Sequence, residues 1–241
     1  MSDAHAIRIC EIFGPTIQGE GALIGLPTVF VRTGGCDYRC RWCDTAYAVD
    51  RSYSNQWMEI SAEEIFAEIG RLCGGQPLMI SLSGGNPALQ PLDGLIRLGK
   101  ASGYRFAMET QGSVVQPWFM ELAVLTLSPK PPSSGMKTDW RKLQECIDVA
   151  GRADLSLKIV VEDDTDYQFA REVSGKFPGI PVYLQPCNNI PVVGVEENIT
   201  ESLAGIERLR WLVTRVLTDA WYEVRVLPQL HVLLWGNKRG R

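Results

Sequence analysis

The sequence lacks an excess of basic residues: 24 Lys and Arg are outnumbered by 28 Asp and Glu, and the formal net charge is −4. A chain of this charge offers no basic surface to a phosphate backbone, so nucleic acid is not expected as a direct partner. The sequence also lacks an apolar run near the ~20 residues that a membrane span needs, and a basic N-terminal segment followed by a long apolar one. We therefore expect a cytoplasmic protein without a membrane partner.

Histidine is scarce, with two residues, whereas cysteine is not, with seven. A reducing compartment keeps thiols free, so a disulfide framework is not expected. Four cysteines (Cys10, Cys73, Cys146 and Cys187) are scattered, and most of them are predicted to be small buried hydrophobic residues. The other three cluster within residues 36–43 in the order C-x3-C-x2-C, and this cluster needs a different explanation.

Strand-like and helical patterns alternate along most of the chain. Apolar, β-branched segments predict strands at 28–33, 77–83, 104–110, 122–128, 154–161, 181–185 and 222–227. Helices are predicted within 61–75, 91–103, 139–151, 164–179 and 200–220, whereas 128–138 and 186–199 show no helical pattern. Nearly continuous apolar strands of this kind suit a parallel sheet that is covered by helices.

The chain of 241 residues, 45% of them hydrophobic, is expected to form one α/β domain over residues 1–241. The architecture that fits is a partial (β/α) barrel with a mostly parallel sheet, which binds ligands at the carboxyl ends of its strands. The C-terminal tail, 228–241, is expected either to close the site or to join the core.

Polar motifs follow four of the predicted strands. The cysteine loop follows the first, "SGGNP" follows the second, "ETQG" ends the third and "SPK" ends the fourth. The carboxyl ends of parallel strands meet at one edge of a sheet, so these motifs are expected to converge. Ordinary turns would account for one or two of them, and four together predict a shared active site.

Three clustered thiols allow more than one interpretation. A structural zinc site takes four protein ligands, and the two histidines, His5 and His231, lie near opposite ends of the chain. Purely structural cysteines are disfavoured by the charged residues among them, Asp37, Arg39 and Arg41. A [4Fe–4S] cluster with three thiolates would keep one iron open to a small molecule, which is the interpretation that the spacing favours.

The cysteine motif, with Trp42 directly before its last cysteine, resembles that of the radical S-adenosylmethionine (SAM) superfamily. "SGGNP" resembles the superfamily's GGE-type motif, whose backbone meets the amino-acid end of SAM. More narrowly, "EIFGPTIQGEGALIGLPTVFVRTGGCDYRCRWCDTAY", "ETQGS", "LSPKPPSS", "LKIVV", "YLQP" and "VLPQLHVLLWGNKRG" resemble the 7-carboxy-7-deazaguanine synthase family over essentially the whole chain.

The resemblance implies a modified, partial barrel of the radical SAM type and a radical carbon–nitrogen lyase. The family's reaction contracts the ring of 6-carboxy-5,6,7,8-tetrahydropterin to 7-carboxy-7-deazaguanine, with loss of ammonia, on the path to queuosine and other 7-deazapurines. The resemblance also implies a [4Fe–4S] cluster, SAM and Mg2+ as cofactors, a flavodoxin or ferredoxin as reductant, and a homodimer. No side chain is implied as the catalyst, because a radical derived from SAM removes the hydrogen.

The resemblance also assigns site residues by position. Those implied to bind the cluster or Mg2+ are Cys36, Cys40 and Cys43 for the cluster and Thr45 for Mg2+. Those implied to bind SAM are Trp42, Cys43, Asp44, Gly85, Ser128, Pro129, Lys130, Gln185 and Asn188. Those implied to bind the pterin substrate are Ile17, Gln18, Gly19, Arg32, Ser83 and Asn237.

Several of these residues also have ordinary structural explanations. Thr45 could cap a helix, and Arg32 could form a surface ion pair of little energetic weight. Glu109 and Lys158 could be a structural pair, which is as plausible as a catalytic role. His231 is expected in the core or near the site rather than as an acid–base catalyst.

Two positions depart from the family's pattern. Asn86 replaces the acidic residue of the GGE-type motif, so any charge contact to the ammonium group of SAM would become a neutral hydrogen bond. In shorter family members the terminal carboxylate lies at the substrate, whereas this sequence continues to Arg241, which leaves the role of Asn237 open.

Two other functions compete with the synthase. A glycyl-radical activating enzyme shares C-x3-C-x2-C, but it acts on a large protein partner and would need neither "TIQGEG" nor Arg32 in a pterin pocket. A zinc-stabilised binding module would need a fourth ligand and would not depend on SAM.

Overall fold

The computed structural model describes residues 6–188 and 199–241. In chain order its strands are β1 (Ile7–Ile17), β2 (Pro27–Thr33), β3 (Met58–Ile60), β4 (Met79–Gly84), β5 (Arg105–Thr110), β6 (Val124–Leu127), β7 (Asp154–Val161), β8 (Val182–Pro186) and β9 (Arg225–Val226). Its helices are α1 (Ala46–Val49), α2 (Ala62–Leu72), α3 (Asp93–Ala101), α4 (Trp140–Val149), α5 (Asp164–Lys176), α6 (Ile199–Thr218) and α7 (Leu230–Trp235).

The strands form one open sheet in the order β3-β1-β2-β4-β5-β6-β7-β8-β9. From β2 to β9 every neighbouring pair is parallel, which confirms the mostly parallel sheet of a partial barrel. The exceptions are β1 and β3, which pair in antiparallel fashion at one edge and were not expected. Gly14 and Pro15 interrupt the β1 sequence, and both residues weaken a strand pattern.

The other elements follow the sequence pattern with small differences. Helix α2 starts at the predicted capping box, in which Ser61 Oγ accepts from the Glu64 N–H and the Glu64 carboxylate accepts from the Ser61 N–H. The last predicted strand, 222–227, is reduced to β9, and Tyr222 beside it is largely exposed. Segment 128–138 contains only a short 3-10 turn, Pro132–Ser134, and the predicted irregular segment 186–199 lies largely outside the described residues.

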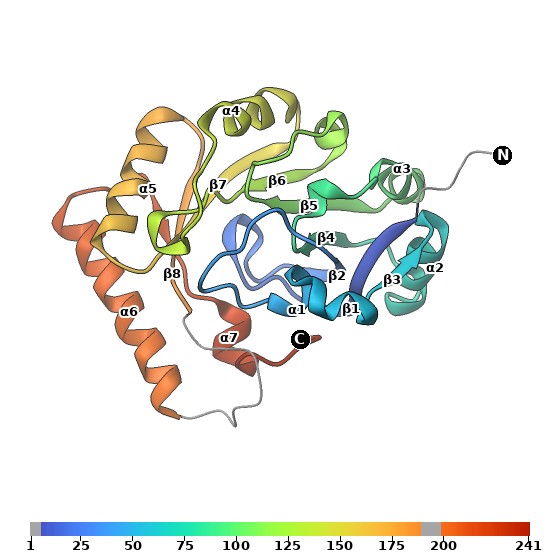
Figure 1. The fold of residues 1–241 in the computed structure, drawn as a ribbon, viewed down its shortest axis with the longest axis horizontal. Helices are drawn as coiled ribbons and strands as arrows, with labels where there is room; N and C mark the ends of the chain where they lie inside the picture. The colour runs from blue at the N-terminus through green and yellow to red at the C-terminus, as the bar shows by residue number, and fades with distance from the viewer. Residues whose placement is uncertain (1–5, 189–198) are drawn as a thin grey trace.

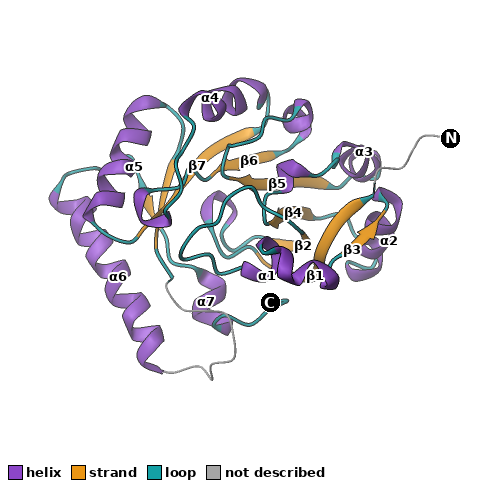
Figure 2. Ribbon diagram, viewed as in Figure 1, coloured by secondary structure: helices purple, strands orange, loops and turns teal. Residues whose placement is uncertain are grey.

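The helices lie around the outside of the curved sheet, as Figures 1 and 2 show for α2 to α6. The short helix α7 and the C-terminus lie instead on the inner side, near α1 and β1. None of the helices in the described part of the chain is long and apolar enough to cross a membrane.

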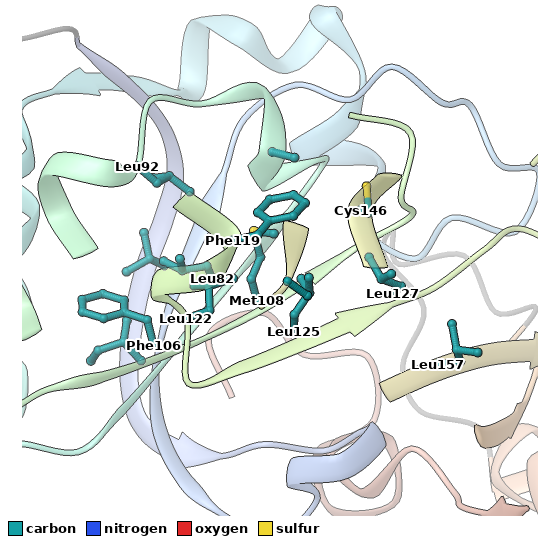
Figure 3. Packing of buried hydrophobic residues seen from close by; sticks show 14 of the residues in the cluster. Leu82, Leu92, Phe106, Met108, Phe119, Leu122, Leu125, Leu127, Cys146 and Leu157 are labelled. Carbon is teal, nitrogen blue, oxygen red and sulfur yellow. The ribbon is translucent and has the colours of Figure 1, made fainter. Parts of the chain in front are cut away.

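Side chains alternate between the two faces of the sheet. The face toward the outer helices carries the core, which includes Leu82 from β4, Phe106 and Met108 from β5, and Leu125 and Leu127 from β6 (Figure 3). The opposite, inner face also has apolar residues, among them Phe30, Ala107 and Val160. Its polar side chains are Arg32, Ser81, Ser83, Glu109, Thr126, Ser128, Ser156, Lys158 and Gln185. Because successive strand residues point to opposite faces, the same strands build the core and a concave surface that carries these polar groups.

Candidate active site

The predicted site residues converge on one cavity of about 260 Å³ on the inner side of the sheet. The predicted residues that line it are Ile17, Gln18, Gly19, Arg32, Cys36, Cys40, Trp42, Cys43, Asp44, Thr45, Ser83, Gly85, Ser128, Lys130, Gln185, Asn188 and Asn237. Pro129 is the exception and is not part of the lining. The four polar motifs at the strand ends therefore do meet, as parallel strands require.

The three clustered cysteines are free thiols at the cavity wall, in the loop between β2 and α1. Burial raises the pKa of Cys40 to about 11 and also raises the pKa of Cys36 and Cys43. The protein alone therefore keeps these thiols protonated. A metal group would have to supply the positive charge that turns them into thiolates.

The cysteine loop is tied to the segment after β6. Tyr38 Oη donates to the Lys137 carbonyl over 2.9 Å, and the Arg41 N–H donates to the Ser134 carbonyl over 3.0 Å. These bonds hold the loop in place with a segment that has little regular structure of its own. Segment 128–138 thus supports the cysteine loop in addition to following a strand.

Trp42, directly before the last cysteine, is held through a chain of hydrogen bonds. Its Nε1–H donates to Ser133 Oγ over 2.8 Å, and Ser133 Oγ donates to Asp166 Oδ2 over 2.5 Å. Asp166 is fully buried, and it also accepts from the Ser133 N–H over 3.0 Å. The indole ring therefore lines the cavity in one fixed orientation, which preorganises it for a flat ligand.

Two glycines allow the loops after β2 and β4 to touch. Gly84 has a φ of +127°, and a Cβ there would lie 2.3 Å from the Thr33 carbonyl oxygen. A Cβ on Gly85 would lie 2.1 Å from the Gly35 carbonyl oxygen. The Gly85 N–H itself donates to the Thr33 carbonyl over 3.2 Å. The glycines thus serve the close approach of two backbones, and Gly85 lines the cavity with its N–H already bonded.

Asn86 differs from the expectation that it offers a neutral hydrogen bond to SAM. Its side chain is fully buried and is not part of the cavity lining. The amide donates to Asp37 Oδ1 over 2.9 Å and to Ser113 Oγ over 3.2 Å, while its oxygen accepts from Thr110 Oγ1 over 2.8 Å. Its hydrogen-bonding capacity is therefore used to join the cysteine loop to the end of β5.

Arg32 is fixed on the inner face of β2 by one edge of its guanidinium. Its Nε donates to Glu11 Oε1 over 2.8 Å, and Tyr47 Oη donates to the same oxygen over 3.1 Å. Within residues 6–188 and 199–241 the terminal nitrogens of Arg32 form no hydrogen bond. The side chain is only 17% exposed, so this is a partly buried pair with a free outer edge rather than a surface ion pair.

Two residues of the cavity lining carry buried polar atoms that lack a partner among the described residues. Ser83 Oγ and Gln185 Oε1 are buried and form no hydrogen bond with the described residues. Such orphaned atoms are rare in folded proteins because each costs about 1–3 kcal/mol when left unsatisfied. Both residues line the cavity, so their atoms are suited to bind a polar ligand.

A buried charge network forms the part of the cavity around β5 and β7. Lys158 is 4% exposed and pairs with Glu20 and with Glu109, whose Oε1 lies 2.6 Å from Lys158 Nζ. Burial disfavours the Lys158 charge, but Glu109 and Glu20 outweigh it and raise the pKa of Lys158. Burial likewise opposes the Glu20 charge, but Lys158, His231 and Gln229 hold the pKa of Glu20 far below its usual range.

The structure bears on the alternatives that the sequence left open for Glu109, Lys158 and His231. Glu109 and Lys158 do form an ion pair, while both also line the cavity. His231 lies at the cavity with Nε2 4.0 Å from Glu20 Oε1, as expected for a residue near the site. Glu20 was not singled out from the sequence, although it sits in the recognised "TIQGEG" segment. Glu20 lies in a loop, where no alternation of polar and apolar residues could have indicated that its side chain is buried.

Thr45 and the C-terminal tail complete the lining. Thr45 lies at the N-terminus of α1, but its side chain makes no capping hydrogen bond, so the helix-cap explanation does not hold. Its Oγ1 instead lies 3.3 Å from Asp44 Oδ1 and faces the cavity wall. Asn237 Oδ1 accepts from Asn188 Nδ2 over 2.9 Å, which joins the tail to the end of β8.

The residues present fit a three-thiolate cluster with a bound SAM. No three His, Cys, Asp or Glu side chains of the described residues converge on a point that could hold one metal ion. A four-iron cluster does not require this, since each thiolate binds a different iron. The orphaned polar atoms and the fixed indole are chemically suited to the polar and flat parts of an adenosyl ligand.

Comparisons with known proteins agree with this site. A model of the radical SAM superfamily matches residues 30–128. The curated 7-carboxy-7-deazaguanine synthase of Bacillus subtilis (strain 168) is 47% identical to the chain, and the match covers 98% of this chain and 99% of the relative. The one of Bacillus cereus is 41% identical, and the match covers 97% of this chain and 98% of the relative. The same name is given to a relative from Thermoplasma acidophilum that is 31% identical over 96% of this chain and 99% of its own.

Solved structures show the same fold. The crystal structure of QueE from Escherichia coli matches with a TM-score of 0.67 and 24% identity, covering 94% of this chain and 95% of that one. Streptococcus suis SuiB bound to S-adenosylmethionine matches with a TM-score of 0.55 and 15% identity, covering 83% of this chain and 50% of that one. Together with the near-complete sequence matches, these findings show that the chain belongs to the 7-carboxy-7-deazaguanine synthase family of radical SAM enzymes.

Proposed function

We propose that this chain is a 7-carboxy-7-deazaguanine synthase, which contracts the ring of 6-carboxy-5,6,7,8-tetrahydropterin with loss of ammonia. The observation that carries the proposal is that the three cluster cysteines and the free edge of Arg32 line one cavity. Near-complete relatives at 47% and 41% identity that bear this name support the choice of substrate. The product places the enzyme on the path to queuosine and related 7-deazapurines.

Cys36, Cys40 and Cys43 would hold the [4Fe–4S] cluster, which leaves one iron for SAM. When bound, cluster and SAM together supply one-electron chemistry that removes hydrogen from a carbon of the substrate. The residues that would hold SAM are Trp42, Cys43, Asp44, Gly85, Ser128, Pro129, Lys130, Gln185 and Asn188. Support for this set comes from the fixed Trp42 ring and the orphaned Gln185 oxygen, whereas Pro129 has only its neighbours in the motif to support it.

Arg32 would bind the substrate carboxylate through its two terminal nitrogens, in the bidentate geometry that guanidinium groups favour. Residues 17–19, Ser83 and Asn237 would contact the pterin edge, whose donors and acceptors match backbone and amide groups. The orphaned Ser83 hydroxyl supports this assignment. Residues 228–241 would close the site against water, supported by the six tail residues in the lining, 236–241.

Thr45 would provide the protein oxygen for Mg2+. Its hydroxyl lines the cavity beside the Asp44 carboxylate and is not used as a helix cap. Mg2+ keeps several waters and accepts few protein ligands, so one hydroxyl with substrate oxygens and waters forms a reasonable set.

We further propose a flavodoxin or ferredoxin as the electron donor, a homodimer, and a cytoplasmic location. Arg39, an exposed loop residue, is adjacent in sequence to Cys40 and would give a protein donor a short route to the cluster. Val213 and Leu217, one turn apart on α6, are exposed apolar side chains that a second copy could cover. Light scattering of the purified protein would test the dimer.

Anaerobic reconstitution tests the activity. The protein is loaded with iron and sulfide, supplied with reductant, Mg2+, SAM and 6-carboxytetrahydropterin, and its products are followed by mass spectrometry. We expect 7-carboxy-7-deazaguanine from the unchanged protein and none from Cys36→Ala, while Cys73→Ala, outside the cavity, retains the reaction. Formation of 5′-deoxyadenosine and methionine without that product would overturn the substrate but keep the superfamily chemistry.

A further inference from the structure

The C-terminal tail brings positive charge to the cavity. Residues 236–241 line it and include three cations, Lys238, Arg239 and Arg241. The tail is anchored by α7, whose Leu230 N–H donates to the Gly19 carbonyl over 2.9 Å. In total, six Lys and Arg side chains but only three Asp and Glu side chains line the cavity of a chain whose net charge is −4. The site is therefore locally suited to an anion.

Arg239 reaches the residues that hold Arg32. Its guanidinium carbon lies 3.8 Å from the centre of the Tyr47 ring, a close cation–π contact. Its Nη2 lies 3.6 Å from Glu11 Oε2, while Arg32 Nε lies 2.8 Å from Glu11 Oε1. One carboxylate thus lies between two arginines that come from opposite ends of the chain.

The donors of Arg239 are still available. At 3.6 Å its approach to Glu11 is an ion pair without a hydrogen bond, and within the described residues its guanidinium makes no hydrogen bond. The side chain is 45% exposed, against 17% for Arg32, so it lies at the open side of the cluster. Among the described residues, Glu11 is the one carboxylate that pairs with both guanidinium groups, and Asp44 acts on Arg32 from farther away. The unused donors of the two arginines are therefore suited to a further carboxylate.

We propose that Arg239 and Arg32 form a two-arginine subsite for the carboxylate of the substrate, with Glu11 and Tyr47 holding both guanidinium groups in place. This inference rests on the proposed function, because it takes the carboxylated pterin as the ligand. It makes the tail a determinant of specificity as well as a cover. A pterin without the carboxylate gains nothing from Arg239, since it brings no negative charge to the subsite.

The test compares two ligands on the cluster-loaded protein with SAM present. Dissociation constants are measured anaerobically for 6-carboxytetrahydropterin and for tetrahydropterin, which lacks the carboxylate. Variants are Arg239→Ala, Arg239→Lys, and Arg71→Ala as a control for loss of an exposed arginine on α2. We expect Arg239→Ala to weaken binding of the carboxylated pterin about 10- to 100-fold, as for other charged hydrogen bonds, and to leave tetrahydropterin and SAM unaffected. The dissociation constant of Arg239→Lys for the carboxylated pterin should lie between those of the unchanged protein and Arg239→Ala, because lysine keeps the charge but lacks the planar guanidinium group.

The remaining outcomes separate this inference from the proposed function. Equal weakening of both pterins in Arg239→Ala would mean that the arginine only packs the tail, and unchanged binding of the carboxylated pterin would mean that it plays no part. Either result, alongside 7-carboxy-7-deazaguanine formation by the unchanged protein, overturns the two-arginine subsite alone. Failure of the unchanged protein to bind or convert the carboxylated pterin overturns the proposed function and this inference with it.

Discussion

The side-chain amide of Asn86 binds the carboxylate of Asp37 over 2.9 Å and thereby joins the loop after β4 to the cysteine loop. The side-chain oxygen of Asn86 also accepts a hydrogen bond from the Thr110 hydroxyl. One buried amide thus joins the cysteine loop, the loop after β4 and the end of β5. An acidic residue at position 86 would set a second carboxylate against Asp37. The neutral residue in the GGNP motif is thus the physically consistent partner for an aspartate at position 37.

This contact predicts that Asn86→Asp destabilises the fold more than Asn86→Ala. The alanine leaves buried partners unsatisfied, for about 1–3 kcal/mol, and the aspartate adds repulsion between like charges. Urea unfolding of the cluster-free protein at neutral pH measures the change in unfolding free energy for both variants. Asn55→Asp, at an exposed position, is the matched control and should change the unfolding free energy by close to zero. An Asn86→Asp protein as stable as the unchanged chain would contradict the importance of this contact.

The glycine contact predicts a severe effect of Gly85→Ala. The added Cβ would lie 2.1 Å from the Gly35 carbonyl oxygen, so the loops after β2 and β4 would have to separate. We expect a lowered thermal midpoint and reduced iron uptake on reconstitution, because the separated loop carries the cysteines. Gly70→Ala in α2 meets no atom within 4 Å and should be neutral or stabilising by about 1 kcal/mol. Equal behaviour of the two variants would refute the crowding argument.

The charge network predicts a pH-dependent loss of stability in Lys158→Met. In the unchanged protein the pKa of Lys158 is raised and that of Glu20 is lowered, so the contribution of this pair is constant between about pH 5 and 8. Without the lysine, we expect burial to raise the pKa of Glu20 above that of the unfolded chain. The variant should therefore be about 3–5 kcal/mol less stable at pH 8, and the deficit should shrink as the pH falls and a glutamate takes up a proton.

Urea midpoints at pH 8 and pH 5.5 measure this trend. Lys100→Met, which removes a partner from the half-exposed pair with Glu121, is the control and should cost no more than about 1 kcal/mol at either pH. A Lys158→Met deficit that is the same at both pH values would show that Glu20 does not become protonated.

Trp42 gives a prediction about cofactor affinity. Trp42→Phe keeps a flat ring but loses the hydrogen bond to Ser133, so we expect a several-fold weaker binding of SAM with the fold unchanged. Trp42→Ala removes the ring and should weaken SAM binding further. Equilibrium dialysis of the cluster-loaded variants measures both, and Trp140→Phe on α4, away from the cavity, serves as the control. Affinities that do not follow this order would argue against a SAM contact of Trp42.

Much of the fold was predictable because local pattern and burial agree. Strands such as β4 and β7 carry apolar residues at every second position toward the helices, and α2 begins at a capping box that is visible in the sequence. Strand β1 was not predicted, because its interior contains Gly14 and Pro15, which interrupt the strand pattern. Short strands such as β9 depend on their neighbour more than on their own residues.

The site was predicted in part. The spacing of the three cysteines constrains the chemistry by itself, and the resemblance placed most of the lining residues. Period-two alternation in the strands could have revealed Lys158 as an inner-face residue, because Leu157 and Ile159 on each side of it are apolar. The loop residue Glu20 and the tail residue Arg239 had no such signal.

The sequence by itself determined the thiol spacing, the strand and helix order, and the placement of polar motifs at strand ends, because these depend on residues close together in the chain. Only the tertiary structure decided the partners of buried charges and amides. Asn86 meets Asp37, Lys158 meets Glu20, and Arg239 meets Glu11 across 49, 138 and 228 residues of sequence. Such pairs form because burial leaves each polar group only the partners that the folded sheet brings within reach.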